Sequence, residues 1–188
     1  MRFLGCLVLL FASCAVADDP APDTPMPPLP NGWADPVAFT DQEYQDVTSS
    51  VATSTDHQQY EFYLEPYWSS LSDRVDAMSQ ASATNPMAQN GLVQLGIGID
   101  GSPGEDSVWG AFVDKWNECS ESALWAGQAK IRMIALEAKL TNTPPLDPLY
   151  VYQAAKVSHH YFQAYRAAMP IASEHAETVE IILTAAGF

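Results

Sequence analysis

The residues best suited to chemistry are a histidine and several carboxylates in the second half of the chain. His175 lies between Glu174 and Glu177, and a histidine among carboxylates binds divalent cations or acts as a general base with a raised pKa. If the two C-terminal helices pack antiparallel, Asp114 and Glu118 lie opposite this histidine. The commoner explanation of such a cluster is a solvated, salt-bridging face. The chemical interpretation is a divalent metal site formed by His175, Asp114 and Glu118, and we expect no other cofactor.

The motifs typical of enzymes do not occur in this sequence. His159 and His160 are adjacent, so on a helix they point about 100° apart and cannot share a metal ion. The Glu-x-x-His repeat of diiron bundles, the Cys-x-x-Cys-His motif of covalently bound haem and the Gly-x-Ser-x-Gly elbow of hydrolases are missing. We therefore expect a protein without enzymatic activity.

The sequence is also rich in large aromatic residues, with 5 tryptophans and 8 tyrosines. Such side chains most often fill a helical core, but they also line apolar ligand pockets. The candidate pocket residues are Tyr63, Tyr67, Trp68, Trp109, Trp116 and Trp125. A small-molecule carrier with an aromatic pocket is therefore one alternative function.

The first helical region follows a capping signal. Thr40 and Glu43 have the spacing of a capping box, which predicts a helix beginning at Asp41. Apolar residues recur at helical spacing as far as Met78, but the Ser/Thr-rich stretch near residue 50 has poor helix propensity. The sequence leaves open whether residues 41–82 form one helix or two. Pro66 is expected to kink this region or to begin a new helix.

Two long helices are predicted in the rest of the chain. Ser102 and Glu105 repeat the capping-box spacing with a proline at the first helical position, which predicts a helix from about residue 106 to 140. Residues 83–104 are rich in Gly, Asn and Pro and are expected to be irregular. Asp147 and the proline after it begin a final helix, which Pro170 kinks and Gly187 ends.

These elements predict an all-α fold, an antiparallel helical bundle of three to four long, proline-kinked helices over residues 40–188. The short turn after residue 140 makes the last two long helices antiparallel neighbours. If that turn centres near residue 144, the expected facing pairs are Asp114 with His175, Cys119 with Met169, Glu121 with Arg166, and Ala126 or Gly127 with Tyr161 or Phe162.

The N-terminal residues predict export from the cytoplasm. Residues 1–17 carry Arg2, an apolar run and a small-x-small site ending at Ala17, which is typical of a secretory signal peptide cleaved after Ala17. Residues 18–39 are proline-rich and predict an extended arm or linker. The minor alternative is a lipoprotein anchored through Cys14. No stretch is long and apolar enough for a transmembrane helix, so we expect a secreted protein, periplasmic or extracellular.

Charge and cysteine content narrow the function classes. The chain has 8 Lys+Arg against 23 Asp+Glu, a net charge of −15, which argues against nucleic-acid binding and suits cationic partners. Cleavage would leave Cys119 as one thiol, expected to be buried in a helix, with an intermolecular disulfide as the alternative. We predict a secreted, non-enzymatic binding or structural protein of the cell envelope or extracellular space. The second alternative is an assembly subunit that joins a protein partner or itself through the arm or Cys119.

Overall fold

The computed structural model describes residues 40–51, 56, 59–98, 101–104, 106–142 and 145–188. The predicted signal peptide with Ala17, Cys14 and the proline-rich arm lie outside the described residues. The fold is all-α, as predicted. Its elements are α1 (Asp41–Ser49), the π-helix η1 (Tyr60–Leu64), α3 (Glu65–Ala81), α4 (Pro86–Leu95), α5 (Val108–Glu137) and α6 (Pro148–Ala186).

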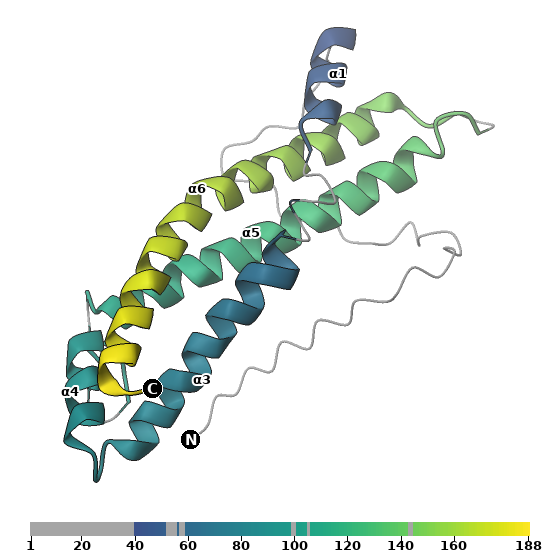
Figure 1. The fold of residues 1–188 in the computed structure, drawn as a ribbon. Coiled ribbons are helices and arrows are strands. Elements are labelled where there is room, and N and C mark those ends of the chain that lie inside the picture. Colours follow the sequence, from purple (N-terminus) through teal and green to yellow (C-terminus); the bar gives the residue numbers. More distant parts are fainter. Residues whose placement is uncertain (1–39, 52–55, 57–58, 99–100, 105, 143–144) are drawn as a thin grey trace.

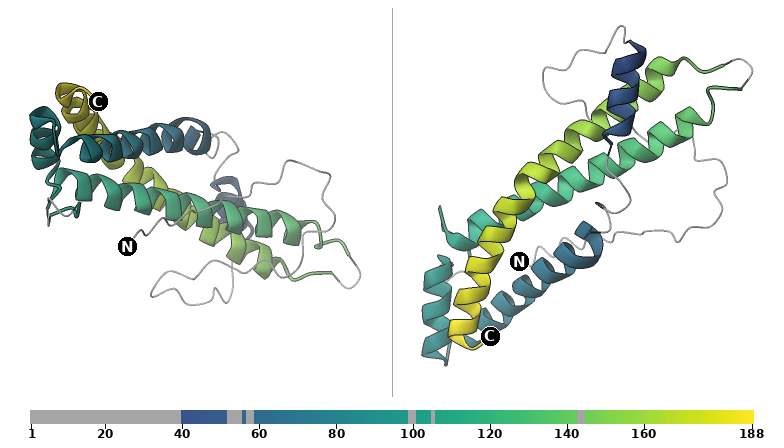
Figure 2. Two further views of the ribbon diagram at one scale, coloured as in Figure 1. Left: turned by 90° about the horizontal axis from the view of Figure 1, so that it is seen from below. Right: turned by 45° about the horizontal axis from the view of Figure 1, so that its top comes forward.

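An antiparallel pair of long helices, α5 and α6, forms the frame of the molecule. Figure 1 shows them side by side, with α3 and α4 against one half of the pair and α1 beside α6 near the other end. The left view in Figure 2 shows α3 and α4 on the same side of this pair. The bundle is therefore thick at one end and thin at the other.

The pairing of α5 and α6 is close to the prediction. The Ser158 hydroxyl donates to the Ala126 carbonyl at 2.9 Å, and the rings of Trp125 and Tyr161 lie 6.5 Å apart. Cys119 lies beside Tyr165, one helical turn from the predicted Met169. The shift arises because α5 ends at Glu137, so the turn begins earlier than the sequence indicates.

Two separate apolar clusters hold the helices together. The larger lies where α3, α4, α5 and α6 meet, and its fully buried side chains include Trp68, Leu71, Met78, Phe112 and Leu183. The smaller joins the other ends of α5 and α6 to α1, and consists of Met133, Val151, Ala154 and Ala155 with the flanking Val47 and Val51. One half of the α5–α6 pair is thus packed against α3 and α4, and the other half against α1.

The sequence prediction is wrong for residues 83–104, which contain a helix. Asn85 caps the N-terminus of α4 by accepting from the Met87 N–H at 2.9 Å, and Gly96 ends the helix in the left-handed conformation with φ 73°. Asn85 and Pro86 thus form the same N-cap and first-turn signal as Asp147 and the proline after it. The abundance of Gly and Asn therefore marks the two ends of a short helix.

The predicted start of α5 is also wrong, because Ser107 and not Ser102 is the N-cap of this helix. The chain after α4 folds back on itself, and Gly104 N–H donates to the Gly96 carbonyl at 2.8 Å. The helix instead begins at Val108, where Ser107 caps it by accepting from Gly110 N–H at 2.9 Å. The residues just before the predicted helix start therefore form a hydrogen-bonded loop, and the helix begins after it.

The start of α1 and both ends of α6 agree with the sequence. The capping box of Thr40 and Glu43 is present at α1, Asp147 caps α6, and Gly187 ends it with φ 86°. Pro170 does not break α6, which runs on continuously and curves along its length in both Figures 1 and 2. Within the described ranges, no helix is long and apolar enough to cross a membrane.

Candidate partner-binding surface

A run of exposed aromatic side chains lies where η1 joins α3. Phe62 is 67% exposed, Tyr63 73% and Tyr67 38%, and Pro66 between them is also exposed. We call Phe62, Tyr63, Pro66 and Tyr67 the aromatic ridge. Isolated exposed apolar side chains are common on soluble proteins, but adjacent ones mark interaction surfaces. The ridge is therefore the candidate partner-binding surface.

The helix is widened into a π-helix just at the ridge. The Glu65 N–H donates to the carbonyl of Tyr60, five residues earlier. Pro66 has no N–H to offer the Phe62 carbonyl, and its ring crowds that carbonyl, which accounts for a local departure from the α-helical pattern. Single π-helical turns occur frequently at functional sites. Here the widened turn places Tyr60 inward while Phe62 and Tyr63 face outward.

A buried polar network fixes the inner side of this turn. The hydroxyl of Tyr60 donates to Glu65 Oε2 at 2.5 Å and also contacts the Ser120 hydroxyl. The same carboxylate oxygen accepts from the Trp116 Nε1–H at 2.8 Å. Burial, followed by the hydrogen bond to Glu65, raises the pKa of Tyr60. Because these bonds join η1 and α3 to α5, they hold the ridge in one orientation.

The ring of Tyr60 also packs among other buried aromatic rings. It lies 6.1 Å from Trp68 and 5.8 Å from Tyr165, in edge-to-face geometry. Among the described residues, neither the Trp68 Nε1–H nor the Tyr165 hydroxyl has a hydrogen-bond partner, although both side chains are buried. Burial is the main cause that raises the pKa of Tyr165 to about 12, and the neighbouring Cys119 is the second.

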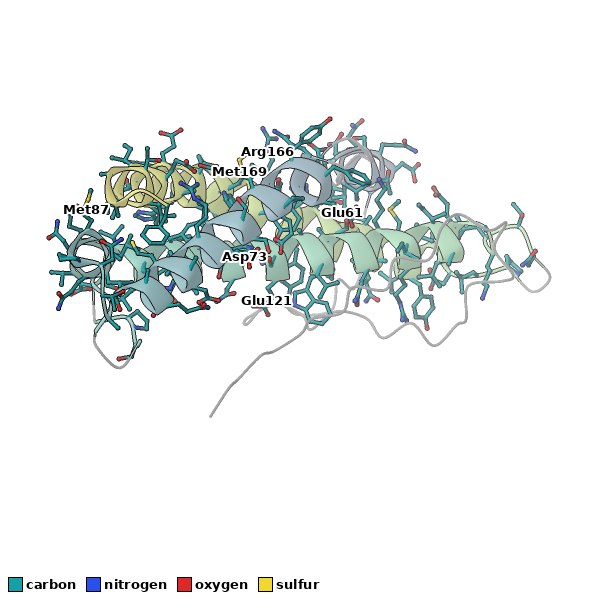
Figure 3. The ribbon with its side chains drawn as sticks, turned by 60° about the horizontal axis from the view of Figure 1, so that its bottom comes forward. Glu61, Asp73, Met87, Glu121, Arg166 and Met169 are labelled. Carbon is teal, nitrogen blue, oxygen red and sulfur yellow. The ribbon has the colours of Figure 1, made fainter. Side chains whose placement is uncertain are left out.

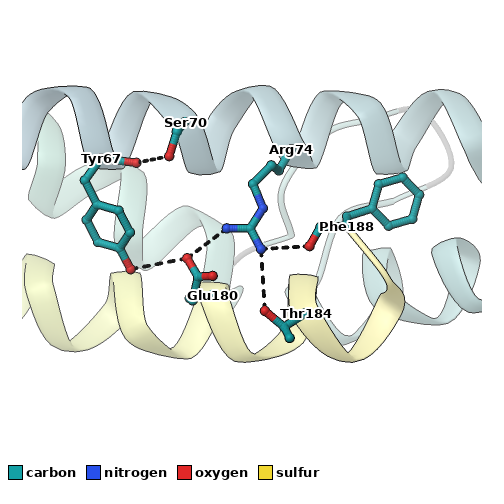
Figure 4. A network of polar contacts seen from close by, with 6 residues as sticks. All are labelled: Tyr67, Ser70, Arg74, Glu180, Thr184 and Phe188. Atoms are coloured by element: carbon teal, nitrogen blue, oxygen red, sulfur yellow. Dashed lines mark hydrogen bonds and ion pairs between the residues drawn. The ribbon is translucent and has the colours of Figure 1, made fainter.

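The carboxylates of α3 give the surface beside the ridge its charge. Asp73 and Asp76 are exposed on the helix that carries Tyr67, and Figure 3 labels Asp73 on α3 and Glu61 on η1. Arg74 is the one cation in α3, and it points towards α6. Its Nη1 pairs with Glu180 Oε2 at 2.8 Å, and Figure 4 shows this contact together with the bond from Tyr67 to Glu180.

The residues predicted as metal ligands do not come together as a ligand group. In the part of the chain that the structure describes, no three His, Cys, Asp or Glu side chains gather around a common point that could hold an ion. Asp114 and Glu118 are exposed on α5 and His175 is half-buried on α6. Glu118 forms an ion pair with Lys115 at 2.5 Å. Metal binding stays a prediction, and this carboxylate belongs to a salt-bridging face.

The six aromatic residues predicted to line one pocket lie in different environments. Trp68 is completely buried, whereas Tyr63 and Tyr67 face solvent. Trp109 and Trp116 pack on Phe112, with ring centres 5.5 and 5.7 Å away. Trp125 lies farther along α5 beside Tyr161. Some of these rings therefore fill the core and others form the ridge.

Two further predictions about single residues agree with the structure. Cys119 is buried in α5, and burial, with Glu118 as the second cause, raises the pKa of its thiol to about 12. A buried, protonated thiol is unsuited to a disulfide with a neighbouring molecule. His159 is half-buried and its Nδ1 lies 3.2 Å from the Ser50 carbonyl, as expected of a hydrogen-bonded histidine. It ties the end of α1 to α6.

Comparisons with protein-family models, with curated proteins and with solved structures find no match to this chain. The candidate surface therefore depends on the geometry of the molecule. The sequence predicts Phe62 on the apolar stripe and Tyr63 and Tyr67 in the core or in a pocket, and all three predictions are wrong because these side chains are exposed. The available signal was spacing: Phe62 with Pro66, and Tyr63 with Tyr67, are four residues apart and share one face of a helix, separate from the face of Trp68 and Leu71.

Proposed function

We propose that this chain is a non-enzymatic binding or structural protein that acts outside the cytoplasm, and that the aromatic ridge is its binding surface. The observation that carries the proposal is the exposure of Phe62, Tyr63 and Tyr67 side by side. Aromatic side chains dominate the energy of protein interfaces because they bury a large area at a small cost in side-chain entropy. The signal-like residues 1–17 support the proposed location.

The buried network behind the ridge supports the same function. Tyr60, Glu65 and Trp116 use their polar groups to join η1 and α3 to α5. A surface held rigid before binding loses less entropy when a partner binds. The network therefore serves to position the ridge.

Native mass spectrometry of the protein purified from its own source tests this proposal, with and without a chelator and a reductant. We expect the mature chain to carry a polypeptide partner that is unaffected by either reagent. The double variant Phe62→Ser, Tyr63→Ser is expected to lose that partner. The matched control Val93→Ser, Ile181→Ser removes side chains that are 70% and 68% exposed on α4 and α6, and should retain it.

Two results would overturn the proposal. One is a partner that stays bound to the ridge variant. The other is a wild-type chain whose added mass is a metal ion or a small organic molecule, which would support the carrier function instead.

A further inference from the structure

The outer face of α3 continues the aromatic ridge with carboxylates. Asp73 and Asp76 are exposed, and neither forms an ion pair within the described residues. Asp73 follows Phe62 by eleven residues and Pro66 by seven, close to three and two whole helical turns, so it lies on the same face about 10–16 Å along the helix. Asp76 lies about one turn beyond Asp73. A partner lying along α3 therefore meets aromatic rings at one end and carboxylates two to three turns farther on.

The cation of α3 does not neutralise these carboxylates, because it is used elsewhere. The Arg74 guanidinium donates to Glu180 at 2.8 Å and to the Phe188 backbone oxygen at 2.7 Å. A third acceptor, the Thr184 hydroxyl, lies 3.5 Å away. As Figure 4 shows, Glu180 and Thr184 lie on α6, and Phe188 follows the end of that helix. The outer face of α3 is thus left with negative charge.

Aromatic rings and carboxylates together suit one kind of side chain. The guanidinium of arginine stacks on aromatic faces and forms paired hydrogen bonds with carboxylates. We infer that the partner of this surface is a basic polypeptide segment whose arginine side chains stack on Phe62, Tyr63 and Tyr67 and pair with Asp73 and Asp76. This inference rests on the proposed function and names the chemistry of the partner.

The negative charge of this surface favours a basic segment over two other possible partners, a second copy of the chain and a neutral apolar helix. A second copy of the chain also carries a net charge of −15, so two copies repel each other over long distances. A neutral apolar helix would cover Asp73 and Asp76 without pairing them, and unpaired carboxylates lose hydration when they are covered. A basic segment instead forms favourable contacts both with the aromatic ridge and with the carboxylates Asp73 and Asp76.

The test uses synthetic helical peptides of about 16 residues, long enough to lie along η1 and α3. One peptide consists of Leu, Ala and Arg, and a second has Glu in place of every Arg. Binding to the whole protein is measured by isothermal titration calorimetry. We expect the Arg peptide to bind and the Glu peptide not to bind.

Matched variants localise the binding. Phe62→Ser, Tyr63→Ser is expected to raise the Kd for the Arg peptide at least about tenfold, whereas Val93→Ser, Ile181→Ser should change it less than about twofold. Asp73→Asn, Asp76→Asn is expected to raise the Kd about three- to tenfold. Glu174→Gln, Glu177→Gln removes the same charge from exposed positions on α6 and should have little effect.

Each contrary result has a distinct meaning. If the two acidic double variants weaken binding equally, or if the ridge variant does not weaken it, the peptide binds by general attraction to an acidic protein and the inference is overturned. The inference is also overturned if the wild-type protein does not bind the Arg peptide. A natural partner that is acidic, neutral or a second copy, and that the ridge variant releases, would overturn the inference while leaving the proposed function intact.

Discussion

At the scale of single residues, the buried tyrosines differ in whether their hydroxyl groups have partners. Tyr60 and Tyr165 belong to the same aromatic cluster, and both are buried. The Tyr60 hydroxyl bonds to Glu65 and Ser120, whereas the Tyr165 hydroxyl has no partner in the part of the chain that the structure describes. A buried polar group stabilises a fold when it is paired and destabilises it when it is not.

Substitution by phenylalanine is therefore expected to change the free energy of unfolding differently at the two tyrosines. Tyr60→Phe should lower it by about 1–3 kcal/mol, because Glu65 and Ser120 lose a buried partner. Tyr165→Phe should leave it unchanged or raise it by about 1 kcal/mol, because an unsatisfied hydroxyl is removed. Urea unfolding followed by circular dichroism measures both.

The exposed Tyr63 supplies the control for this pair. Its hydroxyl is on a side chain that is 73% exposed, so Tyr63→Phe should change the free energy of unfolding by less than about 0.5 kcal/mol. Equal losses in Tyr60→Phe and Tyr165→Phe would contradict the hydrogen-bond assignments.

At the scale of elements, the sequence predicts helices wherever caps and apolar spacing agree. The N-caps Thr40 and Asp147 and the terminal Gly187 are local signals, and the structure uses all three. The cap predicted at Ser102 fails because backbone pairing between Gly104 and Gly96 depends on a loop closing in space. Helix α4 is not predicted, because Asn and Gly are typical both of irregular segments and of the ends of a helix.

The candidate surface was harder to predict than the helices, for a physical reason. Helical spacing groups Tyr63 and Tyr67 on one face, but which face is covered depends on where α3 packs against α5 and α6. The widened turn at Tyr60 shifts that face by one residue, and no local sequence pattern marks it apart from Pro66. Which of these neighbouring aromatic side chains are buried and which are exposed can therefore be determined only from the tertiary structure.

Helix α4 is positioned by the lack of a side chain at Gly91. A Cβ atom at this position would lie 2.6 Å from Met78 Sδ and 3.0 Å from Ala186 Cβ. Alanine normally stabilises a helix relative to glycine by about 0.5–1 kcal/mol. Gly91→Ala should instead lower the free energy of unfolding by about 1–3 kcal/mol, because α4 cannot approach α3 and α6 as closely.

Thermal and urea unfolding show whether Gly91→Ala lowers or raises the free energy of unfolding, with Val93→Ala as the control. Val93 is 70% exposed on the same helix, so its replacement should be within about 0.5 kcal/mol of neutral. A Gly91→Ala variant more stable than the wild type would show that α4 does not pack against α3 and α6 as described.

At the scale of the whole molecule, burial links stability to alkaline pH. Burial raises the pKa of Cys119 from its ordinary value of 9.0 to about 12, and that of Tyr165 from 10.0 to about 12. Both groups are neutral when protonated, so their unfolded forms release protons first as the pH rises. Their contribution to stability is complete below the ordinary values and is lost as the pH rises through the folded values.

We therefore expect the free energy of unfolding to decrease between pH 9.0 and about 12. Cys119→Ala should show a shallower decrease over this interval, because it removes one of the groups whose pKa is raised in the folded state. The comparison uses slopes, since the variant also loses packing at all pH values. Equal slopes for the wild type and the variant would contradict the raised pKa of the thiol.

The central claim is that the chain binds its partner through the aromatic ridge, and site-specific photo-crosslinking in the source cells tests it most directly. A photoreactive phenylalanine analogue replaces Tyr63 in one strain and Ile181 in another, positions with similar exposure of 73% and 68%. The account predicts a crosslinked product of one defined mass at position 63 and none at position 181. No product at position 63, or the same product at both positions, would contradict it.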